Sequence, residues 1–118
     1  MKQNQHQLTL RAPKQGLLEF TGEVAAWLAG QTIAQGLLTV FIRHTSASIL
    51  IQENADPDVM RDLEAFMARL VPEDADAYHH DSEGLDDMPA HIKGVLTSTQ
   101  LAIPVTGGRM ALGIWQGL

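Results

Sequence analysis

The sequence predicts an α+β fold, a sandwich of mostly antiparallel strands in a single domain with two or three helices packed on it. Three observations predict this class. Apolar residues recur at every second position in several short stretches, which is typical of strands. Stretches with helical spacing interrupt them without a regular strand–helix–strand alternation. The chain has 118 residues, enough for one hydrophobic core but not for two, so residues 1–118 are expected to form one domain.

The N-terminal part of the chain is expected to contain two strands and a helix. Residues Gln7–Ala12 alternate between polar and apolar side chains, which predicts a half-buried strand. After a turn at Pro13–Gly16, the apolar residues of Leu17–Phe20 are expected to extend a second strand. Thr21 is a suitable N-cap for a helix that ends near Gly30.

The chain is organised around residues 43–58, where a histidine, three hydroxyl groups, a glutamate and an asparagine follow one another closely. Aliphatic runs at Leu37–Ile42 and Ile49–Ile51 frame this polar stretch and predict a pair of buried strands. The polar residues then lie where the chain leaves one strand and enters the next. Polar groups carried by a rigid apolar scaffold are typical of a functional site.

A helix follows this stretch directly. Asp56 is expected to cap it and Pro57 to occupy its first turn, where the fixed backbone angle of proline suits a helix. Its apolar residues recur at intervals of three and four, and the helix should end before Pro72. This stripe is expected to lie on the sheet; it consists of Val59, Leu63, Phe66 and Leu70.

The C-terminal part is expected to form a loop, a short helix and a hairpin. Residues 73–87 are polar and acidic and predict a surface loop, after which Asp87 is expected to cap a helix that reaches Leu96. Residues 101–114 alternate on both sides of a Gly-Gly turn and predict a hairpin. Pro104 lacks a backbone donor, which predicts an edge or bulge for its strand. The final residues read as an unfinished strand that a partner subunit could cover.

Composition excludes several functional classes. There is no cysteine, so any metal must be held by His, Asp or Glu. The net charge is −6, and twelve of the fourteen acidic residues lie between Glu53 and Asp87, with four of the five histidines within or beside that range. No basic stripe suggests a nucleic-acid partner. No apolar run is long enough to span a bilayer and no cationic leader is visible, so a cytoplasmic location is expected.

The histidines are the first candidates for chemistry. His44 ends a predicted strand, His79 and His80 lie in the acidic loop, and His91 lies on the short helix. A single histidine is more often a hydrogen-bonded structural residue than a metal ligand. Three from different elements can form an open catalytic zinc site, with nearby carboxylates to orient the imidazoles.

The other polar residues have two interpretations each. Ser46 and Ser48 either hydrogen-bond the backbone or donate to a bound phosphate or sulfate. Glu53 and Asn54 belong either to an ordinary turn or to the site. Asp86 and Asp87 are most simply helix caps, with one carboxylate left for Mg²⁺ or for proton transfer.

Four blocks of the sequence resemble, in order and spacing, the YjbQ-like family described as secondary thiamine-phosphate synthases. The likeness extends from Leu8 onward. The blocks are His44-Thr45-Ser46-Ala47-Ser48, Glu53-Asn54-x-Asp56-Pro57, His80-Asp81-x-Glu83-Gly84-x-Asp86-Asp87-Met88-Pro89-x-His91-Ile92-Lys93 and Gly113-x-Trp115-Gln116-Gly117.

The resemblance implies a homotrimer whose polar blocks lie near a subunit boundary. It also implies a weak ability to join hydroxymethylpyrimidine diphosphate to thiazole phosphate with release of pyrophosphate, and it selects His80 over His79. The alternative is a trimeric metabolite- or anion-binding protein without significant turnover.

The expected partners are other copies of the chain and a small phosphorylated metabolite. The expected cofactor is a divalent metal, zinc first, with Mg²⁺ for a diphosphate substrate. The expected site comprises His44, His80 and His91 for the metal, Glu53, Asp86 and Asp87 for catalysis, and Ser46, Ser48 and Asn54 for the substrate.

Two departures from the family pattern are visible. Ile114 stands where the family usually has threonine, which could remove one hydroxyl from the site. The family usually continues for about another strand pair beyond the Trp-Gln-Gly block, so this YjbQ-like domain is expected to lack that C-terminal strand segment.

Overall fold

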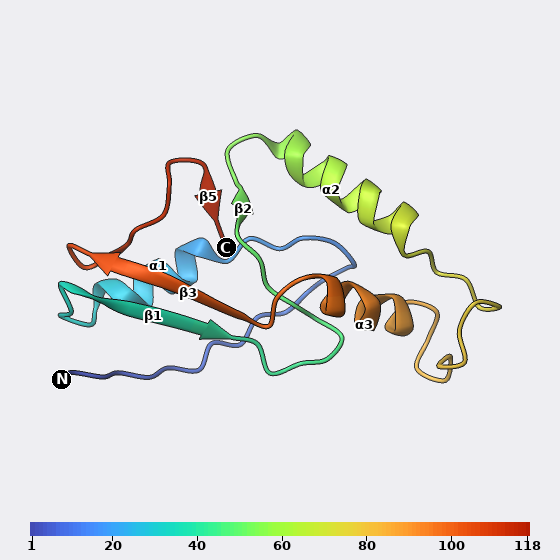
Figure 1. Cartoon of the computed structure of the whole chain (residues 1–118), viewed down its shortest axis with the longest axis horizontal. Coiled ribbons are helices and arrows are strands. Elements are labelled where there is room, and N and C mark those ends of the chain that lie inside the picture. The colour runs from blue at the N-terminus through green and yellow to red at the C-terminus, as the bar shows by residue number, and fades with distance from the viewer.

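The computed structural model of the protein describes all 118 residues and confirms the α+β class (Figure 1). Every strand pairing is antiparallel, and no helix is long and apolar enough to cross a lipid bilayer. The elements in chain order are α1 (Thr21–Ala29), β1 (Gln35–Phe41), β2 (Gln52–Glu53), α2 (Pro57–Leu70), α3 (Asp87–Leu96), β3 (Gln100–Thr106), β4 (Arg109–Met110) and β5 (Gln116–Gly117).

The larger sheet has three strands in the order β1-β3-β4. Strands β1 and β3 pair along their whole length, with Leu38 opposite Ile103. The predicted hairpin is confirmed: β3 and β4 are joined by Gly107 and Gly108, whose φ angles are +59° and +76°. Two consecutive positive φ angles define the tight turn that matches strand twist, and glycine adopts them without steric cost.

β3 is the central strand of this sheet, so the predicted edge strand is wrong, although Pro104 itself lies just outside the β3–β4 ladder, which covers only Val105 and Thr106. The Pro104 carbonyl accepts a hydrogen bond from the amide of Ala111 at 2.8 Å, so its nitrogen also faces the β4 side. The proline therefore removes no hydrogen bond from the ladder between β3 and β1. On the other side the proline cannot return a donor to Ala111, which explains why β4 ends at Met110.

The hydrophobic core lies between α1 and the inner face of the three-stranded sheet. Phe20 and Val24 pack there with Ile49, Ile103 and Leu118. The predicted helix is confirmed, but Thr21 is its first residue rather than its cap. The Thr21 hydroxyl instead accepts from the amide of Leu118 at 2.9 Å, which ties the start of α1 to the C-terminal strand.

Helix α2 begins as predicted but packs differently. The Asp56 carboxylate accepts from the amide of Asp58 at 2.9 Å, and Pro57 is the first helical residue. The apolar stripe does not lie on the sheet, because no residue of α2 is buried and Phe66 and Leu70 are 51% and 54% exposed. Figure 1 shows the helix extending away from the strands.

Three predicted strands are wrong. Gln7–Ala12 and Leu17–Phe20 form no ladder, although Phe20 does enter the core. Ile49–Ile51 contributes one isolated bridge, from Ile49 to Ser98, before β2 begins at Gln52. Alternation favours a strand only when a neighbour supplies ladder hydrogen bonds, and these segments have almost none.

The smaller sheet pairs β2 with β5 and is closed by a tight contact at Gly117. Gln52 lies opposite Gly117, and the amide of Asn54 donates to the carbonyl of Trp115 at 3.0 Å. A methyl group on Gly117 would lie 2.7 Å from Asn54 Nδ2 and 2.9 Å from Asn54 Cβ. Glycine at this position therefore allows Asn54 to pack directly on β5.

Gly117→Ala is expected to destabilise the protein by about 1–3 kcal/mol, because the new methyl group must displace Asn54. Equilibrium urea unfolding measures the change. Gly22→Ala is the matched control, since nothing lies within 4 Å of a methyl group there. Alanine in that helical position should be neutral or stabilising. Equal losses in the two variants would contradict the close contact at Gly117.

Candidate metal centre

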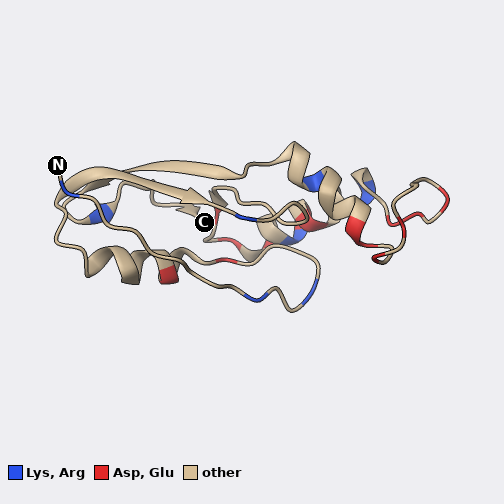
Figure 2. Ribbon diagram, turned by 90° about the horizontal axis from the view of Figure 1, so that it is seen from below, with Lys and Arg blue, Asp and Glu red and all other residues tan.

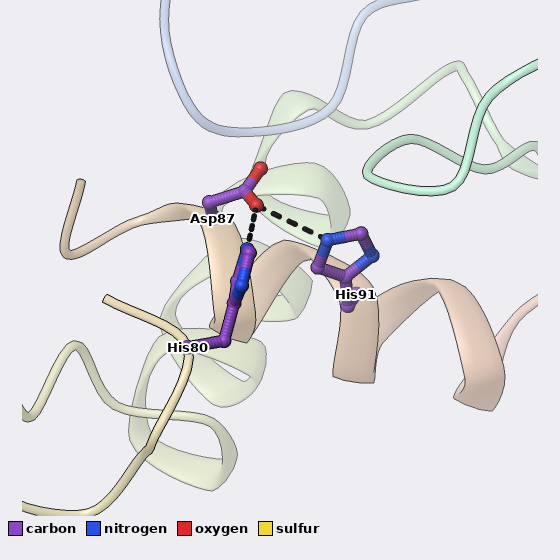
Figure 3. Close-up of side chains that lie close together, drawn as sticks. All are labelled: His80, Asp87 and His91. Carbon is purple, nitrogen blue, oxygen red and sulfur yellow. Dashed lines mark hydrogen bonds and ion pairs between the residues drawn. The ribbon is translucent and has the colours of Figure 1, made fainter. Parts of the chain in front are cut away.

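Three side chains that could bind a metal converge beside the start of α3: His80, Asp87 and His91 (Figure 3). His80 Nε2 lies 2.7 Å from Asp87 Oδ2, and His91 Nε2 lies 3.1 Å from the same oxygen. One potential ligand atom from each residue lies within 4.8 Å of the other two. Residues from a loop and a helix thus meet at one point; of the three histidines expected to meet, the structure brings His80 and His91 together.

The helix brings Asp87 and His91 together because residues four apart share one face. His80 comes from the acidic loop, which turns back at Gly84, where φ is +109°. Asp86 occupies the N-cap position of α3, but its side chain makes no capping hydrogen bond, and Asp87 is the first residue of the helix rather than its cap. The Asp87 carboxylate instead contacts two imidazoles.

The proton on His91 is positioned by the backbone of the preceding loop. His91 Nδ1 lies 2.8 Å from the carbonyl oxygen of Thr45, which can only accept, so Nδ1 carries a hydrogen. In the neutral ring Nε2 then presents a lone pair toward Asp87 Oδ2. Two lone pairs repel, and a cation held between the two atoms would remove this repulsion.

The carboxylate and His80 stabilise each other's charged forms. The hydrogen bond to Asp87 raises the pKa of His80 above its usual value of 6.5. Hydrogen bonds from His80 and then Ser46 lower the pKa of Asp87 from 3.8 to about 2. The ion pair therefore contributes its full stability between about pH 3.8 and 6.5, and this contribution is lost as the pH falls through about 2 or rises through the raised pKa of His80. Above that pKa the neutral imidazole can bind a metal.

Asp87→Asn is expected to lower the pKa of His80 towards 6.5, because the amide removes the charge that favours the imidazolium. NMR titration of the ring protons in chelator measures this value. Asp62→Asn removes a carboxylate from an exposed position of α2 and should leave the titration of His80 unchanged. An unchanged His80 pKa in the Asp87 variant would contradict the ion pair.

The donor set fits a divalent metal. Two imidazoles and one carboxylate are the ligands of many catalytic zinc sites, which keep a fourth position open, and the same set also suits Fe(II). Ligands of a tetrahedral zinc ion lie about 3.3 Å apart. The 2.7 and 3.1 Å separations reach that value by small side-chain rotations. The acidic residues of the 73–87 loop and the start of α3 gather towards one end of the molecule (Figure 2).

Ser46 is the predicted substrate-binding residue that reaches this centre. Its Oγ lies 3.4 Å from His91 Nε2. Its amide donates to His44 Nδ1 at 2.8 Å. His44 itself is not part of the three-residue cluster and lies in the segment that follows β1.

The remaining predicted residues have structural contacts in other places. The Ser48 hydroxyl accepts from Thr97 Oγ1 at 2.5 Å, and Asn54 Nδ2 donates to Glu19 at 2.9 Å. Glu53 lies in β2, and Asp86 precedes Asp87 at the start of α3. The sequence interpretation missed the Thr45 carbonyl, and no side-chain pattern could have identified a backbone group.

The comparisons with known proteins agree with the resemblance of the four blocks. A family model described as "UPF0047 protein YjbQ-like" matches residues 6–118. A UPF0047 protein of Synechocystis is 50% identical over 117 residues, which cover 99% of this chain and 80% of that protein. The YjbQ protein of Escherichia coli O157:H7 is 44% identical over 115 residues, covering 97% and 83%.

The fold also matches solved structures. The crystal structure of an uncharacterised YjbQ/UPF0047 family protein from Clostridium acetobutylicum superimposes with a TM-score of 0.81 at 31% identity, covering 92% of this chain and 81% of that one. A conserved hypothetical protein from Thermus thermophilus has a TM-score of 0.78 at 34% identity, with coverage of 93% and 82%.

Proposed function

This chain belongs to the YjbQ-like UPF0047 family, and we propose that it is a metal-dependent enzyme that acts on a small phosphorylated metabolite at His80, Asp87 and His91. The observation that carries the proposal is the convergence of these three side chains on one point. The Thr45 carbonyl adds support, since it leaves the Nε2 lone pair of His91 facing the other two ligand atoms.

The finer proposal is a weak thiamine-phosphate synthase activity. In this reaction a bond forms from the thiazole nitrogen to the methylene carbon of hydroxymethylpyrimidine diphosphate. The carbon–oxygen bond breaks, and its electron pair leaves with pyrophosphate. A divalent ion held at this centre supplies positive charge that offsets the charge of the diphosphate. We propose that Ser46, whose Oγ lies 3.4 Å from His91 Nε2, donates a hydrogen bond to the substrate, and that Asp86, next to Asp87 in the chain, orients a proton.

Metal content tests the centre directly. Protein purified without chelator and reloaded with zinc is expected to hold one ion per chain, measured by elemental analysis after dialysis. His80→Ala, Asp87→Ala and His91→Ala should each weaken zinc binding by about tenfold or more, because each removes one of three ligands. Unchanged zinc content in all three variants would reject the centre.

Two matched histidine variants refine this test. His79→Ala changes the exposed neighbour of His80 and should keep full zinc content. His44→Ala tests which set of residues holds the metal: the three histidines expected from the sequence, or the cluster in the structure. Retained zinc in that variant supports His80, Asp87 and His91 as the ligands, whereas loss comparable to that in His91→Ala would add His44 to them.

Turnover distinguishes this function from the alternative. The two phosphorylated substrates are supplied with zinc or Mg²⁺, and thiamine phosphate and pyrophosphate are quantified. Product that disappears in Asp87→Ala supports the enzyme. Metabolite binding without product in any metal condition would favour the trimeric binding protein.

We also propose that the chain assembles with copies of itself, as a homotrimer. Its accessible surface is 8537 Å², whereas a folded monomer of 12.9 kDa exposes about 6,300 Å². Only 10 of 118 residues are buried. The outer face of the three-stranded sheet, opposite α1, is largely apolar, and we propose that it is the contact surface. It comprises Leu37, Thr39, Phe41, Ala102 and Pro104.

A further inference from the structure

An open surface pocket of about 540 Å³, called the cavity below, lies at the end of β1, outside the metal-binding cluster. Two apolar residues, an arginine, a histidine and two threonines line it. The lining residues are Phe41, Ile42, Arg43, His44, Thr45 and Thr99.

The charge of this cavity is opposite to that of the whole chain. The sequence has fourteen acidic residues and eight basic ones, yet no carboxylate lines the cavity. Arg43 forms no ion pair within the chain, so its guanidinium is available to a ligand. A guanidinium presents paired donors that match the oxygens of a phosphate or carboxylate.

The tautomer of His44 also favours the binding of an anion. Its Nδ1 accepts a hydrogen bond from the amide of Ser46 at 2.8 Å. In the neutral ring the hydrogen therefore resides on Nε2, which is a donor. Together with Arg43 and the hydroxyls of Thr45 and Thr99, this donor makes the polar side of the cavity suited to an anion.

The segment from His44 to Ser46 connects the cavity to the proposed metal centre. The Thr45 carbonyl accepts from His91 Nδ1 at 2.8 Å, and Ser46 Oγ lies 3.4 Å from His91 Nε2. An anion held in the cavity is thus separated from the metal ligands by one short stretch of chain. A ligand with two functional groups could reach both.

We infer that this cavity binds the phosphate group of an organic phosphate, with Arg43 and His44 as donors and with Phe41 and Ile42 against the apolar part of the ligand. The ligand class rests on the proposed function, but the cavity itself needs no metal. Phe41 also belongs to the outer sheet face proposed as the contact surface between copies, so the apolar side of this site would lie at the edge of that surface in the trimer.

Binding of inorganic phosphate and of phenyl phosphate to the full chain tests the inference, measured by calorimetry in chelator. Both should bind, and phenyl phosphate more tightly, because its ring gains contact with Phe41 and Ile42. Arg43→Gln should weaken phosphate binding by about tenfold or more, since it removes a charge-assisted hydrogen bond. Arg61→Gln is the matched control: it removes an equal charge from an exposed position of α2 and should bind as the unmodified protein does.

Two outcomes would overturn the inference. One is absence of phosphate binding up to about 10 mM. The other is an equal loss in the Arg43 and Arg61 variants, which would mean attraction by overall charge alone. Zinc content of Arg43→Gln is measured in parallel and should be unchanged. Failure of phosphate binding with intact zinc binding rejects the cavity alone, whereas the reverse result rejects the metal centre alone.

Discussion

Ile103→Ala is expected to destabilise the protein by about 2–5 kcal/mol, a large share of the 5–15 kcal/mol that holds a typical domain together. Ile103 is only 2% exposed and lies in the central strand β3, where it belongs to the same core cluster as Phe20 and Val24. Its truncation removes buried methyl groups and leaves a cavity, because the paired strands on one side and α1 on the other cannot close around it. Urea unfolding measures the loss.

Ile114→Ala is the control for this prediction. It makes the same chemical change at a residue that is 87% exposed, so stability should change by no more than about 0.5 kcal/mol. Both variants are compared at one protein concentration, because self-association would otherwise contribute to stability. If the two variants lost stability equally, the core would have to lie in another place than between α1 and the larger sheet.

The parts of the fold that the sequence predicts well are set by local rules. The start of α2 depends on the cap at Asp56 and on Pro57, and the β3–β4 turn depends on Gly107 and Gly108, all within a few residues. Strand partners depend on distant residues instead. Residues Gln7–Ala12 alternate as a strand should but have no partner, whereas β1 pairs with β3 some sixty residues away in sequence.

The candidate site divides in the same way. The spacing of Asp87 and His91 on one helical face is a local signal, and it could have been used to bring Asp87 into the metal cluster. Its prediction as a helix cap was wrong because α3 begins one residue earlier than expected, so Asp86 takes the N-cap position and Asp87 lies in the first turn. The place of His44 could not be predicted, because it depends on how the loop through Ser46 turns after β1.

Leu37→Asp is expected to convert the proposed trimer, three chains of 12.9 kDa each, into monomers. Leu37 is 68% exposed in the single chain and lies opposite Pro104 on the outer face of the three-stranded sheet. Burying a carboxylate there against apolar surface costs several kcal/mol without a partner charge. Size-exclusion chromatography with light scattering measures the mass, and circular dichroism checks that the monomer remains folded.

Leu70→Asp provides the contrast, because Leu70 is also exposed and apolar but belongs to α2, away from the sheet. That variant should remain a trimer. Dissociation of the Leu70 variant alone would move the contact surface to the apolar stripe of α2, and a monomeric unmodified protein would reject self-association altogether. Because Leu37 is already exposed in one chain, its replacement should hardly change the stability of the monomer. A loss of assembly without unfolding therefore attributes the effect to the surface between copies rather than to the core.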